Sequence, residues 1–282
     1  MKQKVQYRPA LFALVFILIG CDNTIEPIVD DVTGYAVYGY LDMRTERQVI
    51  RVEALRPILL ASSGDLGDLS VTSYDNNTGQ HFEWTDSSAF DNSGVPITLF
   101  TAHFRPLEGH EYSLIVEGSG GTALEATTTI PTAPIFYSDE LRGTIENLTQ
   151  PVFLQGIAVP PQDLRVEYTM INVGEEDPVT IPVSYGNQGF ALNEGWTFNV
   201  NYYSDQYVVM RQLGRDLGEP GIRFKKLALS FAVPSIEWQE APGSNILNGH
   251  GFFGSVAGYQ YEWRLDAAGV ELLGWIDEQP LE

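Results

Sequence analysis

The chain has 282 residues, of which 44% are hydrophobic, 12% aromatic and 19% charged, and its formal net charge is −21. This composition is typical of one or two folded domains and excludes intrinsic disorder over the whole length. The negative charge repels nucleic-acid phosphates, so we expect no nucleic-acid partner. The acidity favours solubility, and an acidic face for cations or basic partners is the alternative interpretation.

Residues 1–20 have the pattern of a lipoprotein signal peptide. A start with three basic residues precedes an unbroken apolar run over residues 11–19, which suits a signal peptide and is too short to span a membrane. The run ends in Leu-Ile-Gly-Cys, which resembles the bacterial lipobox, and Cys21 is the only cysteine of the chain. The resemblance implies cleavage before Cys21 and lipidation of its thiol. An ordinary secretory leader with an unrelated cysteine is the alternative.

Residues 21–33 are predicted to be a lipidated acidic tether. The segment carries four acidic residues and Pro27, which suits an extended chain that holds a domain away from a membrane. Acidic residues directly after the cysteine resemble the surface-export signals of Bacteroidota lipoproteins, whereas in enteric bacteria an Asp at this place tends to retain a lipoprotein at the inner membrane. We therefore expect a lipid-anchored outer-membrane protein on the periplasmic or the cell-surface face.

Residues 34–131 are predicted to form an antiparallel β-sandwich of the immunoglobulin or prealbumin kind. Alternating apolar and polar residues predict short strands over residues 35–41, 47–55, 69–74, 81–84, 97–104, 111–117 and 123–130. Turn-forming stretches separate several of them, among them Asp-Asn-Asn-Thr-Gly at 75–79. Prolines at 131 and 134 mark the boundary of this domain.

A second, mostly β domain is predicted over residues 132–282. Large apolar residues stand at alternate positions in residues 164–171, 196–203, 227–233 and 259–265. Such alternation buries one face of a strand and leaves the other in water. Residues 205–216 fit neither a strand nor a helix well, and residues 267–275 are compatible with a short helix or a last strand.

The sequence contains no motif of a known catalytic or cofactor site. The histidines are His81, His103, His110 and His250, and none has the spacing of a zinc site. His103 and His110 flank a turn and are the best metal pair, but we expect all four to be on the surface or hydrogen-bonded. Residues 75–79 begin like a calcium loop, yet Gln80 stands where that loop needs Gly, which favours a hairpin turn. We expect no enzyme activity, metal or cofactor; a hydrolase with two distant carboxylates stays as an alternative.

Two groups of aromatic residues are candidates for binding. One lies within residues 196–207 and the other within residues 252–263. Core positions on strands explain most of them, whereas Tyr203 and Tyr207 fall outside the alternation and are predicted to be exposed. Exposed Tyr and Trp offer contact area to a glycan or to a partner protein.

Several short stretches occur in an order that resembles one family. They are the lipobox, Tyr-Gly-Tyr-Leu at 38–41, Leu-Glu-Gly-His-Glu-Tyr-Ser-Leu at 107–114 and Asn-Ile-Leu-Asn-Gly-His-Gly-Phe-Phe-Gly at 245–254. This order is similar to that of an uncharacterised lipoprotein family of Bacteroidota, domain of unknown function 4249. Members often lie near genes for TonB-dependent outer-membrane receptors, so the resemblance implies an accessory role in uptake or surface assembly. It implies no catalytic residue.

The stretch 245–254 is predicted to be a loop that either binds a partner or supports the fold. Its glycines permit a positive φ or close backbone approach, and its asparagines are placed to pin a loop that seats one of its two Phe residues in the core. The candidate residues are Asn245, Asn248, Gly249, Gly251, Phe252, Phe253 and Gly254.

The sequence as a whole predicts a lipid-anchored cell-envelope protein that binds or scaffolds without chemistry of its own. The expected partners are the membrane, through Cys21, and a TonB-dependent outer-membrane receptor, as the family resemblance implies. A glycan-binding or adhesive surface module is the alternative.

Overall fold

The computed structural model describes residues 34–55, 68–90, 94, 96–118, 123–240 and 245–280. The predicted signal peptide (1–20) and the acidic tether (21–33) with Cys21 lie outside these residues. The prediction of a mainly β protein is confirmed, because 55% of the residues lie in strands and 10% in helices. Within the described ranges, no helix is long and apolar enough to cross a membrane.

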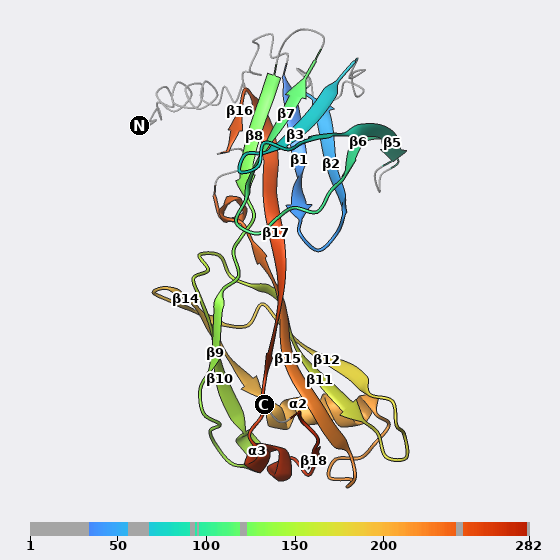
Figure 1. The fold of residues 1–282 in the computed structure, drawn as a ribbon, viewed down its shortest axis with the longest axis vertical. Coiled ribbons are helices and arrows are strands. Elements are labelled where there is room, and N and C mark those ends of the chain that lie inside the picture. Colours follow the sequence, from blue (N-terminus) through green and yellow to red (C-terminus); the bar gives the residue numbers. More distant parts are fainter. Residues whose placement is uncertain are drawn as a thin grey trace, which may run out of the picture.

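The N-terminal unit is a sandwich of two sheets (Figure 1). One layer is part of a nine-stranded sheet, here called sheet A, and the other is the five-stranded sheet B. This part of sheet A contains β1 (Tyr35–Asp42), β2 (Arg47–Ala54), β5 (Thr85–Phe90), β6 (Pro96–His103) and the first half of β17 (Gly249–Trp263). Sheet B contains β16 (Ile246–Leu247), β8 (Ala123–Thr129), β7 (Glu111–Glu117), β3 (Ser70–Asp75) and β4 (His81–Glu83).

The core of this unit includes side chains from strands β16 and β17, which come much later in the chain. The predicted alternation holds for β1, where Val37 and Leu41 are fully buried. Ile246, Phe253 and Ala257 belong to the same core cluster, and β17 pairs with β1 in parallel. The sandwich predicted for residues 34–131 therefore does not contain all the strands of its own core.

The C-terminal unit is a second sandwich. Its share of sheet A contains β12 (Val179–Gly186), β11 (Gln162–Ile171), β15 (Arg223–Pro234), β18 (Ile276–Asp277) and the second half of β17. The opposite layer, sheet C, has the order β13 (Phe190–Leu192), β14 (Gly195–Asn201), β10 (Thr149–Gln155) and β9 (Ile135–Ser138). Helices α2 (Tyr202–Gln212) and α3 (Ala267–Leu272) lie at the far end of this unit (Figure 1). Two short 3-10 helices, η2 (Ile145–Asn147) and η3 (Ile236–Trp238), complete the elements of the described chain.

Strand β17 joins the two units. Phe253 lies in the N-terminal core, Trp263 packs against the C-terminal core, and Tyr259 packs against both. Figure 1 shows β17 running from one lobe into the other, with β15 beside its second half. Because these residues all occupy odd positions of one strand, both cores lie on the same side of sheet A.

One predicted strand ends earlier than expected. Residues 196–203 were predicted as a strand, but β14 stops at Asn201 and α2 begins at Tyr202. The Asn201 side chain accepts a hydrogen bond from the Ser204 N–H (3.0 Å), which is a helix N-cap. Tyr202 is therefore buried as the first residue of a helix. The uncertain stretch 205–216 is helical as far as Gln212.

A fragment of residues 34–131 should not fold on its own. It lacks Ile246, Phe253 and Ala257 from its core, and losing a buried Phe alone typically costs about 3–5 kcal/mol. The same fragment fused through a flexible linker to residues 245–258 should regain a cooperative urea transition, followed by circular dichroism. Cooperative unfolding of the shorter fragment would contradict the role given to β17.

Candidate functional site

The outer face of the N-terminal sandwich carries a group of aromatic side chains, here called the aromatic cluster: Tyr38, Tyr40, Trp238 and Phe252. Since Val37 and Leu41 point into the core, alternation along β1 turns Tyr38 and Tyr40 outward, where they are 46% and 40% exposed. The parallel register places Phe252 of β17 beside Tyr38. Trp238 comes from η3 and is 39% exposed.

Three rings of the aromatic cluster, Tyr40, Trp238 and Phe252, are in edge-to-face contact. The centroid of Trp238 lies 5.6 Å from that of Tyr40 and 5.0 Å from that of Phe252. The indole N–H of Trp238 donates to the carbonyl of Ser255 (3.1 Å). A Cβ atom at Gly254 would lie 3.1 Å from the Trp238 Nε1 atom, so the indole rests directly on this glycine. Trp238 is therefore held by one hydrogen bond and by its contacts with two neighbouring rings.

The stretch 245–254 is strand, not the predicted loop. It contains β16 and the start of β17, with Asn248 at a positive φ of 56° between them. The Asn245 amide donates to the carbonyls of Thr127 (2.5 Å) and Phe253 (2.6 Å). Phe253 is fully buried, whereas Phe252 faces outward into the aromatic cluster. The stretch thus builds the fold and also supplies one ring to the exposed face.

Two of the candidate glycines in this stretch sit where a side chain would clash. A Cβ atom at Gly249 would meet the Leu124 side chain at 2.2 Å, and one at Gly251 would lie 1.9 Å from the carbonyl oxygen of Val37. These contacts come from the neighbouring strands β8 and β1. The glycines therefore permit close packing of strands, which is a structural role.

Tyr203 and Tyr207 lie together on α2. Tyr207 is 47% exposed and Tyr203 is half-buried. Their hydroxyls are 2.8 Å apart and their rings are perpendicular, with centroids 5.2 Å apart. The two rings do not form a flat strip.

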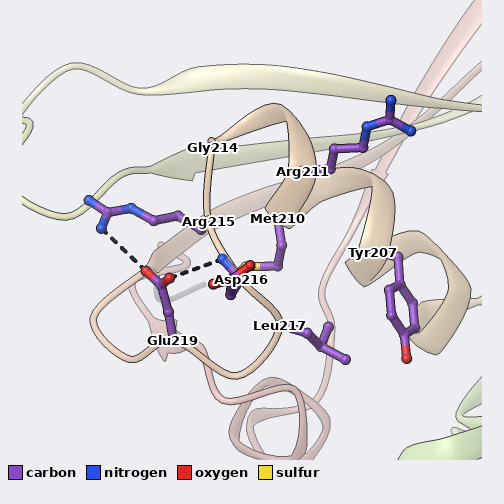
Figure 2. Close-up of a pocket in the computed structure, with 8 residues that line it drawn as sticks. All are labelled: Tyr207, Met210, Arg211, Gly214, Arg215, Asp216, Leu217 and Glu219. Atoms are coloured by element: carbon purple, nitrogen blue, oxygen red, sulfur yellow. Dashed lines mark hydrogen bonds and ion pairs between the residues drawn. The ribbon is translucent and has the colours of Figure 1, made fainter.

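An open hollow of about 640 Å³ lies at the C-terminal end of α2 (Figure 2). Its lining includes Tyr207, Leu217 and Arg215, and its carboxylates are Asp216 and Glu219. The Arg215 guanidinium is engaged by Glu219 (3.3 Å) and by the side-chain oxygen of Asn172 (3.0 Å). None of the four histidines lines this hollow.

The histidines of the described chain do not gather. His81, His103 and His250 are exposed, and the described residues contain no group of His, Cys, Asp and Glu that would hold a metal ion. His110 lies 2.9 Å from a carboxylate oxygen of Asp75 through its Nδ1 atom. The other oxygen of Asp75 accepts from the N–H groups of Asn77 and Thr78. The stretch 75–79 is a turn, as predicted, and Asp75 holds it closed.

A buried carboxylate lies in the C-terminal core. Asp205 of α2 is 3% exposed and accepts hydrogen bonds from the hydroxyls of Tyr168 (2.5 Å) and Tyr185 (2.8 Å). Burial raises the pKa of Asp205 to about 6, although the two tyrosine hydroxyls act in the opposite direction. Both partners are neutral, so the charge of Asp205 is hydrogen-bonded but not neutralised.

Comparisons with known proteins leave the family of the chain open. No family model matches it, and no curated protein matches it in sequence. A chain of a cytokine receptor complex is 12% identical with a TM-score of 0.23, over 83% of this chain and 98% of that one. A pullulanase from Anoxybacillus sp. LM18-11, solved with maltotriose, is also 12% identical with a TM-score of 0.23, over 70% of this chain and 24% of that one. TM-scores this low carry no argument about function.

The aromatic cluster was not identified from the sequence as one site. Tyr38 and Tyr40 were assigned to a strand, and Trp238 was not singled out. The available signal was the position of both tyrosines opposite to Val37 and Leu41 in the alternation of β1. The parallel pairing with β17, which brings Phe252 to the same face, had no signal in the local sequence.

Proposed function

We propose that this protein is a lipid-anchored cell-envelope protein that binds a partner protein beside an outer-membrane transporter and has no chemistry of its own. Its anchor is the thiol of Cys21, and its acidic tether holds the folded part away from the membrane. The anchor follows from the lipobox resemblance, and the partner from the resemblance to the lipoprotein family. The binding role itself is supported by the aromatic cluster.

The composition of the aromatic cluster suits a protein interface. Tyr, Trp and Phe are the residues enriched at the centres of protein–protein contacts, where charged residues are depleted. On the neighbouring strand β2, Arg51 pairs with Tyr38 in register and forms an ion pair with Glu53. The arginine beside the aromatic cluster is therefore paired with a carboxylate.

Co-purification from gently solubilised outer membranes tests this proposal. We expect a TonB-dependent receptor to accompany the wild-type protein in mass spectrometry. The double variant Tyr38→Ser with Tyr40→Ser should recover at least about tenfold less partner, because hot-spot residues contribute about 2 kcal/mol or more each. Tyr74→Ser is the matched control: this tyrosine is 38% exposed but lies in sheet B.

Two results would contradict the proposal. If the wild-type protein is purified from the membrane without a partner, the proposed partner is contradicted. If the double variant and the control recover equal amounts of partner, the interface is not at the aromatic cluster. The Cys21→Ala protein, prepared in parallel, should leave the membrane fraction. Continued membrane association without acyl labelling would remove the anchor.

A further inference from the structure

The outer face of sheet C is a second exposed aromatic surface, on a different layer from the aromatic cluster. Alternation along β9 and β10 turns Phe136, Val152 and Leu154 toward the core, and the remaining positions outward. The positions on the outward side of the four strands are Ile135, Tyr137, Thr149, Pro151, Phe153, Gln155, Phe190, Leu192, Gly195, Thr197, Asn199 and Asn201, of which Pro151 and Gly195 are buried. None of them carries a charge, in a chain whose net charge is −21.

Strand register arranges the apolar members of this face in two rows. The first row runs Tyr137, Phe153, Thr197, Phe190 across the four strands, and the second runs Ile135, Gln155, Gly195, Leu192. The ends of both rows are well exposed: Ile135 is 66% exposed, Tyr137 46%, Phe190 71% and Leu192 46%. Exposed apolar residues that gather on one face mark binding sites, whereas singly scattered ones do not.

The aromatic members of the first row come from three strands. Tyr137 and Phe153 stack face to face, with their centroids 4.7 Å apart and their planes 9° apart, so each ring covers one face of the other. Phe190 stands two strands away, about 10 Å from the line of Phe153 at the usual strand spacing. Between them in the first row lies Thr197, whose hydroxyl donates to the carbonyl of Val152 (2.9 Å). In the second row Gly195, which has no side chain, stands between Gln155 and Leu192. Small residues therefore occupy strand β14 in both rows, between the larger residues of β10 and β13.

Two uncharged polar side chains lie on the same side of sheet C. Asn199 follows Thr197 on the same side of β14 and is exposed. The Gln155 amide lies in the second row and reaches only a long contact of 3.4 Å to Glu194. An amide both donates and accepts hydrogen bonds, so it matches a hydroxyl group. A purely apolar ligand would bury these amides without partners, which is unfavourable.

We propose that the outer face of sheet C binds a neutral carbohydrate chain. A pyranose ring presents C–H groups on its faces, which pack against aromatic rings, and hydroxyls at its rim, which bond to amides. Tyr137, Phe153 and Phe190 supply the stacking surfaces, and Gln155 and Asn199 the hydrogen bonds. An acidic glycan finds no cation here and is repelled by the charge of the protein. This inference does not depend on the lipid anchor or on the transporter.

Calorimetric titration of the full chain, solubilised in detergent, tests this site. The probes are the hexasaccharides of cellulose, starch, xylan and mannan, with the hexamer of polygalacturonate as the acidic counterpart. We expect at least one neutral hexasaccharide to bind and the acidic one not to bind. Tyr137→Ser and Phe190→Ser should each weaken binding about tenfold, the loss of roughly one stacked ring. Both side chains are exposed on edge strands, so these variants should fold, which circular dichroism checks.

Two further variants separate a carbohydrate from other occupants. Tyr74→Ser is the matched control, since Tyr74 is 38% exposed against 46% for Tyr137 but lies on β3 of sheet B, and it should bind as the wild type does. Asn199→Leu should weaken carbohydrate binding, whereas it would strengthen a purely apolar contact.

The outcomes that overturn the proposal are distinct. The proposed site is contradicted if none of the four neutral hexasaccharides binds, or if Tyr137→Ser and Phe190→Ser both bind with unchanged affinity. Preference for the acidic hexamer would contradict the proposal that the ligand is neutral. Concentration-dependent dimerisation in sedimentation that Phe190→Ser abolishes would assign this face to a second copy of the chain.

Discussion

Replacing Gly251 with alanine should destabilise the protein by about 4–5 kcal/mol or prevent the N-terminal sandwich from folding. Gly251 has a φ of 114°, which residues with a side chain rarely adopt. Its Cβ atom would lie 1.9 Å from the carbonyl oxygen of Val37. The obstacle is backbone in the middle of a strand, so the clash can be relieved only by separating β17 from β1. Urea unfolding followed by tryptophan fluorescence measures the loss.

Gly79→Ala is the matched control for this change. Gly79 also has a positive φ, 75°, and lies in the same sandwich, but nothing stands within 4 Å of its added Cβ atom. It should lose only the backbone penalty of about 1–2 kcal/mol. The difference between the two variants isolates the steric contact between β17 and β1. Equal losses would mean that the parallel pairing of these strands is not what stabilises the sandwich.

The local pattern of the sequence predicted most strands of the N-terminal unit, and the reason is physical. Residues 111–117 were predicted as a strand and form β7 with those bounds, because Tyr112, Leu114 and Val116 alternate with residues of the other face. Alternation is a local property, so it can be read without knowing the partner strand. The edge strands β5 and β13 escaped prediction, since their residues are nearly all exposed and show no alternation of burial.

Long-range pairing is what the sequence could not supply. The glycines of residues 245–254 were interpreted as a loop, because glycine in isolation favours turns. In the structure Gly249 and Gly251 are required where β17 passes close to β8 and β1, and those partners lie more than a hundred residues away in the chain. The same pairing brings Phe252 next to Tyr38. The aromatic cluster and the shared strand β17 therefore have a single origin, which no local pattern reveals.

The face of sheet C illustrates the same limit. Phe190, Tyr137 and Phe153 belong to three separate short strands, and each is an ordinary aromatic residue in the sequence. Only the register across β13, β14, β10 and β9 brings them into one row. The sequence singled out Tyr203 and Tyr207 as exposed aromatics; they lie instead on α2 with perpendicular rings, and of the two only Tyr207 is exposed.

The stability of the protein should fall as pH rises through the range in which Asp205 loses its proton. The pKa of Asp205 is about 6 in the folded protein, whereas that of an aspartate exposed to water is 3.8, because burial disfavours the charged carboxylate. Below pH 3.8 both the folded and the unfolded states hold the proton. Between pH 3.8 and about 6 only the folded state holds it, so each step up in pH favours unfolding. Above that range both states are ionised and the effect is constant, at about 3 kcal/mol.

Asp205→Asn removes this titration and keeps a side chain of the same shape. The free energy of unfolding of the variant, minus that of the wild type, should therefore rise by about 3 kcal/mol between pH 4 and pH 7 and then level off. Urea titrations at a series of pH values measure this difference, in which the other carboxylates cancel. Parallel pH profiles for the two proteins would show that Asp205 is not held in the low-polarity site between Tyr168 and Tyr185.

Asp75→Asn should give the opposite sign and serves as the control. Burial acts to raise the pKa of Asp75, but the hydrogen bonds from His110, Thr78 and Asn77 outweigh it and lower the pKa. The stability that this carboxylate contributes is present above its unfolded pKa of 3.8 and is lost as pH falls below that value. With rising pH, the free energy of unfolding of the wild type should therefore increase relative to that of Asp75→Asn. It should decrease relative to that of Asp205→Asn. The two buried aspartates then respond to pH in opposite directions. At Asp75 the hydrogen bonds to the carboxylate outweigh the effect of burial on the pKa, whereas at Asp205 burial outweighs the hydrogen bonds.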